Sequence, residues 1–377
     1  MTHVLVIGGG FAGYSAALAA RRAGAEVTVV ARAPGATALY AGAMEIVDNL
    51  ESVLETQLHH PFARLGLDAV RISSELDTAV QAIQLALEKG GLKFEGGWRS
   101  RGIYADIHGL ARPGNLVPAT VAGGELGALA GRRVAVVGVP QVSDYDAAST
   151  AQALKELHGI DAFAEDVSMP NLPMSASLTD LYGRRAPTLS KARAASVAYP
   201  PGFTNLPDDC FELLAAPPSP HGWRLQQVIG LGSVTAVIDS FDSESGRISA
   251  ARAGDRVFRA DAFVLATGHH IGGGIRGGRA PAEPLAGLGV FHDGSPASSG
   301  GARLRHLEYL NAAAEMRSGL MTDKQLHPLA EAGAAPYSNL YAAGSVLGGY
   351  DYAGSCGFGV PLLTGWLAGT FAAKATR

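Results

Sequence analysis

A glycine-rich turn at the amino terminus constrains the fold of this chain more than any other feature. The sequence opens with an apolar run, Val4–Ile7, which has the character of a buried parallel strand, and the motif G-x-G-x-x-G follows it over residues 8–13. The Ala-rich stretch Tyr14–Ala23 then predicts a helix, and Glu26–Val30 predicts a second strand. A strand, a glycine turn, a helix and a strand in this order predict a nucleotide-binding β-α-β unit.

Each glycine of the turn has its own physical role. Gly8 permits a tight turn, Gly10 lets phosphate oxygens approach the backbone, and Gly13 allows close contact between helix and strand. The N–H groups and the positive dipole end of the helix then attract an anion. We therefore expect a nucleotide-type cofactor here, rather than a glycine-rich turn with a structural role alone.

The end of the second strand lacks a residue that adenine-dinucleotide sites use. Such sites place an acidic residue there to hold the adenosine ribose. This strand ends instead in Ala31 and the cationic Arg32. A cofactor that ends in a monophosphate, such as FMN, suits the helix dipole and Arg32 better than FAD or NAD. The alternative is that Arg32 is a solvated surface residue and that the ribose is held elsewhere, so FAD stays open.

Composition and charge exclude several classes of function. The chain has 377 residues, 47% of them hydrophobic, and a net charge of −4 without long runs of one sign, which argues against nucleic-acid binding. Cys210 and Cys356 are far apart and form no C-x-x-C, so an iron–sulfur cluster held by this chain is not expected. No direct membrane span and no signal peptide are predicted, and a cytoplasmic location is the default.

A second strand–helix–strand unit lies in the middle of the chain. Arg132–Gly138 predicts a buried strand, a helix follows from near Asp144 to about Leu157, and Asp161–Glu165 predicts another strand. This unit has no glycine triad, so we expect a structural subdomain rather than a second nucleotide site. The Pro-rich residues 169–221 are expected to form an irregular cap or linker.

The carboxyl-terminal half predicts further strands. Val234–Ile238 and Gly246–Ala251 alternate in polarity and predict a β-meander. The meander leads to a buried strand that ends in Ala-Thr-Gly at residues 266–268. Asn339–Gly344 predicts a last strand and loop, and a helix follows from about Pro361. Two shorter segments, residues 44–58 and 78–87, also look helical.

These pieces together resemble the flavoproteins with two dinucleotide-binding domains. That superfamily pairs the amino-terminal glycine motif with a late strand ending in Ala-Thr-Gly, and with a carboxyl-terminal strand–Gly–acid motif that contacts the flavin. Residues 266–268 and Tyr341–Gly344 occupy those places, while Ser345 replaces the usual acid. A hydroxyl can still hydrogen-bond a ribityl chain or a phosphate.

Within the superfamily, the chain is most similar to the B-subunit of anaerobic glycerol-3-phosphate dehydrogenase. The similarity rests on Asn339–Asp351, Gly354–Val360, Gly319–Pro328, the segment around Met44-Glu45-Ile46 and the strand at Arg132–Gly138. It implies an FMN-type flavin and work beside a catalytic FAD subunit and an iron–sulfur, membrane-anchoring subunit. The implied reaction oxidises sn-glycerol 3-phosphate to dihydroxyacetone phosphate, and the electrons pass to quinone. A peripheral position at the inner face of the membrane, through the partner subunits, would follow.

The resemblance predicts an α/β, Rossmann-like FAD/NAD(P)-binding fold with a parallel central sheet, a β-meander and an inserted second α/β subdomain. We expect residues 1–130 to form the first part of the flavin-binding domain with a helical insertion, 131–222 the inserted cap subdomain, and 223–377 the rest of the flavin-binding domain. The residues expected to contact the cofactor are Gly8, Gly10, Phe11, Ala12, Gly13, Arg32, Gly42, Thr267, Gly268, Gly344, Ser345, Gly348, Gly349 and Gly359.

Two histidines and two arginines are candidates for substrate chemistry. His269 and His270 directly follow Gly268, and a histidine there could act as a general base because its pKa lies near working pH. A pair of histidines at the end of a strand is, however, often only a polar cap. Arg276 and Arg279 could bind a phosphate bidentately, or they could be solvated in a flexible loop. No metal site is expected.

Three hypotheses remain open on the sequence alone. The chain is a flavin subunit of a glycerol-3-phosphate dehydrogenase complex, with or without direct contact to substrate. Alternatively, it is a stand-alone flavin dehydrogenase or reductase of another small hydroxy or keto compound. In the third hypothesis, it is a redox-silent scaffold subunit.

Overall fold

The computed structural model describes residues 1–189, 194–277, 281–297, 316–350 and 357–375. The chain groups into two units. The first unit comprises Met1–Ala36, Ile46–Ala86 and Ile229–Arg377, and the second comprises Thr37–Glu45 and Leu87–Val228. Each unit is built on its own parallel sheet.

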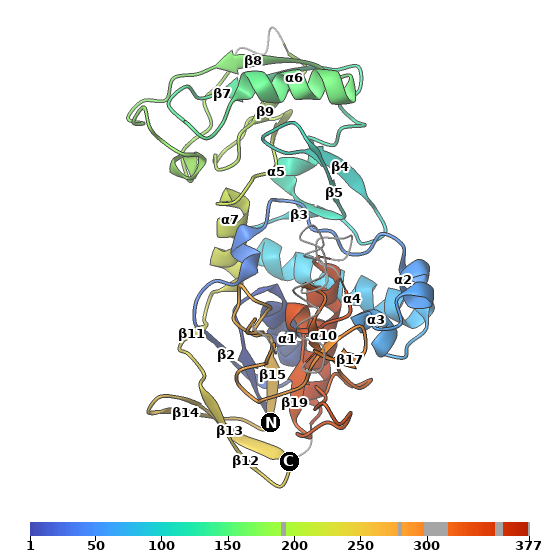
Figure 1. Cartoon of the computed structure of the whole chain (residues 1–377). Coiled ribbons are helices and arrows are strands. Elements are labelled where there is room, and N and C mark those ends of the chain that lie inside the picture. The colour runs from blue at the N-terminus through green and yellow to red at the C-terminus, as the bar shows by residue number, and fades with distance from the viewer. Residues whose placement is uncertain (190–193, 278–280, 298–315, 351–356, 376–377) are drawn as a thin grey trace. The chain divides into compact units, whose positions relative to one another are not determined.

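A five-stranded sheet forms the centre of the first unit, in the order β11-β2-β1-β15-β19. Every neighbouring pair in it is parallel. The core strands β1 and β15 carry continuous apolar runs, as expected for parallel strands covered on both faces. Figure 1 shows β2, β15 and β19 beside the helices α1 and α10. The strands are β1 His3–Ile7, β2 Glu26–Ala31, β11 Val234–Thr235, β15 Ala262–Leu265 and β19 Leu340–Ala342.

Two helices beside this sheet pack closely together through small residues. α1 spans Phe11–Arg22 and α10 spans Gly359–Ala373. A Cβ atom on Gly365 would stand 2.5 Å from the carbonyl oxygen of Ala12, and one on Gly369 would overlap the carbonyl oxygen of Ala16. The Ser15 hydroxyl donates a hydrogen bond of 2.7 Å to the Leu362 carbonyl oxygen. The glycines therefore set how near the carboxyl-terminal helix comes to the helix of the glycine motif.

The predicted meander is present, but one of its predicted strands belongs elsewhere. β12 (Ser240–Glu244), β13 (Arg247–Ala253) and β14 (Arg256–Arg259) form an antiparallel three-stranded sheet. Val234–Ile238 was expected in the meander, yet only Val234–Thr235 is a strand, and it pairs with β2 at the edge of the parallel sheet. Alternating polarity suits either position, because an edge strand also has one exposed face.

The second unit contains a four-stranded parallel sheet, in the order β10-β9-β7-β8. The predicted strand–helix–strand unit is confirmed as β7 Arg133–Gly138, α6 Ala147–His158 and β8 Asp161–Asp166. The Asp146 side chain accepts from the N–H of Ala148 at the start of α6, and Gly159 ends the helix with a φ of 67°.

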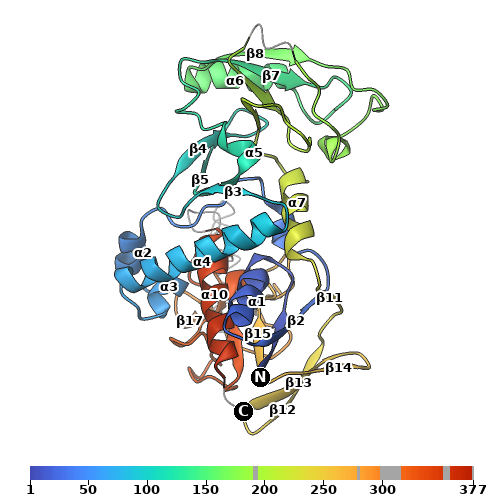
Figure 2. The same ribbon diagram turned by 180° about the vertical axis from the view of Figure 1, so that it is seen from behind.

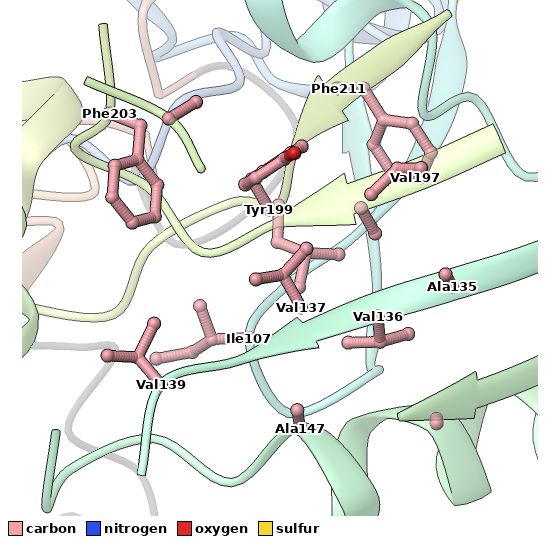
Figure 3. Close-up of a cluster of buried hydrophobic side chains, with 14 of the residues drawn as sticks. Ile107, Ala135, Val136, Val137, Val139, Ala147, Val197, Tyr199, Phe203 and Phe211 are labelled. Atoms are coloured by element: carbon pink, nitrogen blue, oxygen red, sulfur yellow. The ribbon is translucent and has the colours of Figure 1, made fainter. Parts of the chain in front are cut away.

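Residues 169–221 contribute more regular structure than expected. β9 (Ser196–Tyr199) and β10 (Cys210–Glu212) complete the sheet of the second unit, although we predicted an irregular cap or linker there. Their side chains enter a core of aliphatic and aromatic residues. Figure 3 shows Tyr199, Phe203 and Phe211 in the upper part of this cluster, with Val136 and Val137 of β7 below them.

The remaining elements are short, apart from one long helix. α4 spans Ala69–Lys89, far beyond the predicted residues 78–87, whereas the predicted helix at 44–58 is reduced to α2. Figure 2 shows α2 and α3 near α10. These elements are α2 Leu50–Thr56, α3 Pro61–Arg64, α5 Ala119–Ala122, α7 Pro220–Ile229, β3 Phe94–Gly96, β4 Gly102–Ala105, β5 Ala111–Gly114, β6 Leu116–Pro118, β16 Val290–His292, β17 Ser295–Pro296, β18 Gly319–Leu320, and the 3-10 turns η1 Ala36–Leu39, η2 Leu178–Leu181 and η5 Gly344–Val346.

The expected fold class is confirmed: the chain has a parallel central sheet, a β-meander and a second α/β unit. The second unit groups residues 87–130 with 131–222, whereas the sequence placed residues 87–130 in the first domain. The division into domains at 130 and 222 stays a prediction about folding units.

Candidate cofactor site

The glycine turn after β1 has a conformation that depends on glycine. Gly8 has a φ of 127°, and a Cβ atom on it would overlap the carbonyl oxygen of Ala266 at the end of β15. A Cβ atom on Gly13 would overlap the carbonyl oxygen of Gly8. Backbone atoms therefore lie against the turn on two sides and leave no room for a side chain at Gly8 or Gly13. This is what a tight turn at Gly8 and a close contact at Gly13 require.

The first turn of α1 is suited to an anion. The N-cap residue Gly10 offers no side-chain hydrogen bond, and the first helical turn contains no acidic residue, whereas Arg21 and Arg22 lie in the last turn. The positive end of the helix dipole is thus not offset by a carboxylate of its own helix. Gly35, in the loop after β2, lies against the turn, since a Cβ atom on it would stand 3.7 Å from the Gly10 Cα. Small residues thus surround the helix start.

The strand order reverses at this turn. From β1 the chain crosses to β2 on one side, while β15 lies on the other side. In open α/β sheets, the ligand crevice lies at the carboxyl ends of the strands where the order reverses. Gly8 and Thr267 stand there side by side: a Cβ atom on Gly8 would come 3.2 Å from the Thr267 nitrogen.

The carboxyl-terminal motif reaches the same helix end. Gly344 follows β19 with a φ of 80°, and a Cβ atom on it would come 2.5 Å from the Cβ of Ala12. The Ser345 hydroxyl oxygen lies 3.7 Å from where a Cβ of Gly268 would stand. The rings of Phe11 and Phe358 meet edge to face at 5.1 Å. The structure thus brings together Gly8, Gly13, Phe11, Ala12, Thr267, Gly268, Gly344 and Ser345 from three separate segments.

Three other predicted glycines of the cofactor site make close backbone contacts in the first unit. A Cβ atom on Gly348 would stand 2.6 Å from the Gly319 nitrogen. On Gly349 it would overlap the His59 carbonyl oxygen, and on Gly359 the Ile46 carbonyl oxygen. These glycines let the tail pack on neighbouring segments, and their contact with a cofactor stays a prediction.

Arg32 and Gly42 lie in different surroundings. Arg32 is exposed just after β2 and makes no ion pair or side-chain hydrogen bond with the described part of the chain. No carboxylate follows β2 directly, and the argument from this against an adenosine ribose site stays a prediction. Gly42 belongs to the second unit, has a φ of 123°, and would place a Cβ 2.7 Å from the His221 Cδ2. Its role toward a cofactor remains a prediction.

His269 and His270 both hydrogen-bond backbone carbonyl groups. The Nε2 of His269 donates to the Ser318 carbonyl oxygen at 2.6 Å, and the Nδ1 of His270 donates to the Ile275 carbonyl oxygen at 3.1 Å. A carbonyl oxygen can only accept, so these contacts assign the proton of each neutral ring. His269 is buried and His270 half-buried, and their rings lie 4.1 Å apart edge to face. This geometry suits a cap at the end of the strand. The nitrogen that can accept a proton is then Nδ1 in His269 and Nε2 in His270.

The predicted substrate arginines gain little support from their positions. Arg276 is exposed, and its backbone pairs with Ala282 in a short antiparallel contact. Arg279 lies outside the described residues. Their role in binding phosphate stays a prediction.

Sequence reasoning missed a pair of polar side chains on α3. His60 is buried, its Nδ1 accepts a hydrogen bond of 3.1 Å from the Phe62 N–H, and Arg64 lies one helical turn later. The His-His-Pro sequence at residues 59–61 was the available signal. Burial of a polar side chain cannot be read from such a short segment.

Two further observations hold for the described residues. Each helix in them is too short or too polar to cross a bilayer. The same residues contain no group of three or more His, Cys, Asp or Glu side chains arranged to hold a metal ion.

Comparison with known proteins supports a flavin fold. Residues 3–168 match the family model described as an FAD binding domain. The chain is 28% identical over 443 residues to a protein from Halobacterium salinarum named as a probable B-subunit of anaerobic glycerol-3-phosphate dehydrogenase, with 99% of this chain and 98% of the relative covered. It is 24% identical over 417 residues to the B-subunit of anaerobic glycerol-3-phosphate dehydrogenase from Pectobacterium carotovorum subsp. carotovorum, with 96% of each covered.

Among solved structures, the open conformation of a flavocytochrome c3 fumarate reductase aligns with 99% of this chain and 78% of that chain, at 14% identity and a TM-score of 0.43. That level of similarity says nothing about substrate. The resemblance expected from the sequence is confirmed by the two named relatives, which align with nearly the whole of this chain.

Proposed function

We propose that this chain, a homologue of the B-subunits of anaerobic glycerol-3-phosphate dehydrogenase, is a flavin-bearing subunit of such a complex. The observation that carries the proposal is the convergence of the glycine turn, Ala-Thr-Gly at 266–268 and the Gly344 motif on the first turn of α1. Relatives of the same name align over nearly the whole chain, so the proposal extends to both units.

The residues at this end of α1 fit the phosphate end of a flavin. Glycine backbone and small side chains surround the helix start, no acidic residue of the first turn opposes an anion, and Gly10 leaves the N-cap without a side chain. We propose FMN, because Arg32 stands where an adenine dinucleotide would find a carboxylate. FAD is the alternative, and the match to an FAD binding domain favours it.

When bound, a flavin supplies the acceptor of the hydride removed from a secondary alcohol. The residues of this chain would then bind the substrate and receive its hydroxyl proton. Of the two histidines, we favour His270 as the base, because its Nδ1–H is held by the Ile275 carbonyl oxygen and the residue as a whole is half-buried, whereas His269 is buried. The bond fixes the tautomer, so Nε2 is the nitrogen that can accept a proton.

Electrons taken up here need an acceptor outside the chain. The sequence has two cysteines, too few for an iron–sulfur cluster held by cysteine alone. We therefore propose partners of two kinds, a catalytic FAD subunit and an iron–sulfur subunit that leads to quinone. In that arrangement the chain is cytoplasmic and meets the inner face of the membrane through its partners.

Two measurements test the proposal. The first denatures the purified chain and identifies the released yellow compound by chromatography: FMN is expected, FAD would overturn the argument from Arg32, and a colourless chain would favour the scaffold hypothesis. The second adds sn-glycerol 3-phosphate without air and follows flavin bleaching. We expect reduction in the assembled complex. Bleaching of the isolated chain only by another hydroxy compound would instead favour a stand-alone dehydrogenase.

A further inference from the structure

Two buried hydrogen-bond donors on α3 have no acceptor. The Nε2 of His60 and the Nε of Arg64 are shielded from solvent and make no hydrogen bond in the described part of the chain. Buried polar atoms in native proteins nearly always have a partner, so each unsatisfied one calls for an explanation. Because both atoms belong to donors, the missing group is an acceptor.

The state of His60 is fixed by its surroundings. Its Nδ1 accepts a hydrogen bond from the Phe62 N–H, so the ring proton must be on Nε2. Burial lowers the pKa of His60 to about 3, because it disfavours the charged ring. His60 is therefore a neutral donor at physiological pH, and its donating atom is the unsatisfied one.

Arg64 adds a positive charge on the same side of the helix. It follows His60 at i+4, which places the two side chains on one face. One terminal nitrogen of Arg64 donates to the Thr322 carbonyl oxygen at 2.6 Å, but no carboxylate pairs with Arg64 among the described residues. Lys324 approaches the same helix end: its Cε lies 2.7 Å from where a Cβ of Gly66 would stand. A half-buried guanidinium without a counter-ion favours an anion.

His60 lies beside the segment that also borders the cofactor crevice. The tail segment, here residues 344–350 and 357–359, leaves β19 next to Ala12 and returns with Phe358 against Phe11, both in the first turn of α1. Between these ends, Gly349 packs on the backbone of His59, and the Tyr350 ring meets the His60 ring edge to face at 5.7 Å. His60 and the first turn of α1 thus contact the same segment.

We infer that His60 and Arg64 form an oxyanion subsite that binds the phosphate group of a small phosphate monoester next to the cofactor crevice. The identity of that ester as the substrate rests on the proposed function. His60 supplies a neutral donor, and Arg64 supplies charge-assisted donors held in place by the Thr322 carbonyl group. The subsite offers a phosphate position other than the exposed Arg276.

Two conservative variants test the subsite while each keeps one interaction of the original side chain. His60→Asn keeps a side-chain acceptor for the Phe62 N–H, as asparagine is a good N-cap residue, but it loses the Nε2 donor. Arg64→Lys keeps the positive charge but loses the planar fork and its Nε. Arg71→Gln, an exposed arginine of α4 paired only loosely with Glu75 at 3.9 Å, is the matched control.

The measurement is binding of inorganic phosphate and of sn-glycerol 3-phosphate to the full chain, by calorimetry and by the rise in Tm that each causes. For each ligand, we expect the Arg71→Gln variant to bind with the same affinity as the wild-type chain. We expect His60→Asn and Arg64→Lys to bind each ligand about 10-fold to 100-fold more weakly. A loss for the ester but not for inorganic phosphate would overturn the inference, because it would place the phosphate elsewhere.

The inference and the proposed function can fail separately. If both variants keep wild-type affinity for phosphate while the complex still oxidises sn-glycerol 3-phosphate, the subsite is wrong and the function stands. If the complex is inactive with that substrate but phosphate affinity falls in both variants, the subsite stands for another phosphate monoester.

Discussion

At the scale of single residues, Gly8 illustrates how backbone conformation fixes a binding turn. Gly8 has a positive φ, and any side chain placed on it would also overlap the Ala266 carbonyl oxygen. Gly24 also has a positive φ, 87°, but open space where a Cβ would stand. A substitution at Gly24 therefore tests backbone strain alone, whereas one at Gly8 tests backbone strain and steric overlap together.

We predict that Gly8→Ala lowers the free energy of unfolding more than Gly24→Ala does. In each variant the strained φ lowers the free energy of unfolding by about 1–3 kcal/mol. Gly8→Ala lowers it further, because the new Cβ would overlap the backbone at the end of β15 and push β1 and β15 apart. Urea unfolding of the two variants beside the wild type measures the difference. Equal losses would mean that the turn tolerates a side chain.

Acid stability depends on His60 in a direction that its burial determines. The folded pKa of about 3 lies below the unfolded value near 6.5, so the unfolded chain binds more protons between these values. Stability is thus lost as the pH falls below about 6.5, by up to about 1.4 kcal/mol per pH unit. We expect His60→Asn to flatten this dependence, as measured by urea unfolding at about pH 7 and about pH 5.5. An unchanged slope would show that the ring is not buried.

At the scale of elements, α1 and α10 are held together by glycine. A helix interior normally gains about 1 kcal/mol when glycine becomes alanine. We predict the opposite sign for Gly369→Ala, because its Cβ would overlap the Ala16 carbonyl oxygen. Thermal unfolding gives the sign, with Thr370→Ala in the same helix as the control. A rise in Tm for Gly369→Ala would contradict this packing.

Sequence patterns predicted the elements whose signal is local. The glycine motif, Ala-Thr-Gly at 266–268 and the helix from about Pro361 all lie where expected, because each has its own turn chemistry. The strand at Val234–Thr235 was placed in the wrong sheet, since alternating polarity does not name a partner strand. β9 and β10 were missed among prolines, and buried strands as short as these carry no periodic signal.

The site was predicted in the same uneven way. Residues in glycine motifs converge on α1 as expected, because those motifs encode backbone shape. His60 and Arg64 were not predicted, because their importance comes from burial and from unsatisfied hydrogen bonds, which depend on Thr322 and Tyr350 far along the chain.

At the scale of the whole molecule, the first unit carries every described segment that meets at the start of α1. We expect the isolated chain to hold its flavin yet to need partner subunits for passing electrons to quinone. Quinone reduction assayed with and without the copurified partners tests this expectation. Full activity of the isolated chain would argue for a stand-alone enzyme.

The most direct test of the account is flavin occupancy in the variant Gly10→Val. Gly10 has an ordinary extended conformation, with a φ of −83° and a ψ of −175°, so valine there adds bulk at the helix start without a left-handed strain. We predict that the folded variant contains no flavin after purification, while the wild-type chain is yellow. Full flavin occupancy in Gly10→Val would contradict the claim that this turn holds the phosphate of the cofactor.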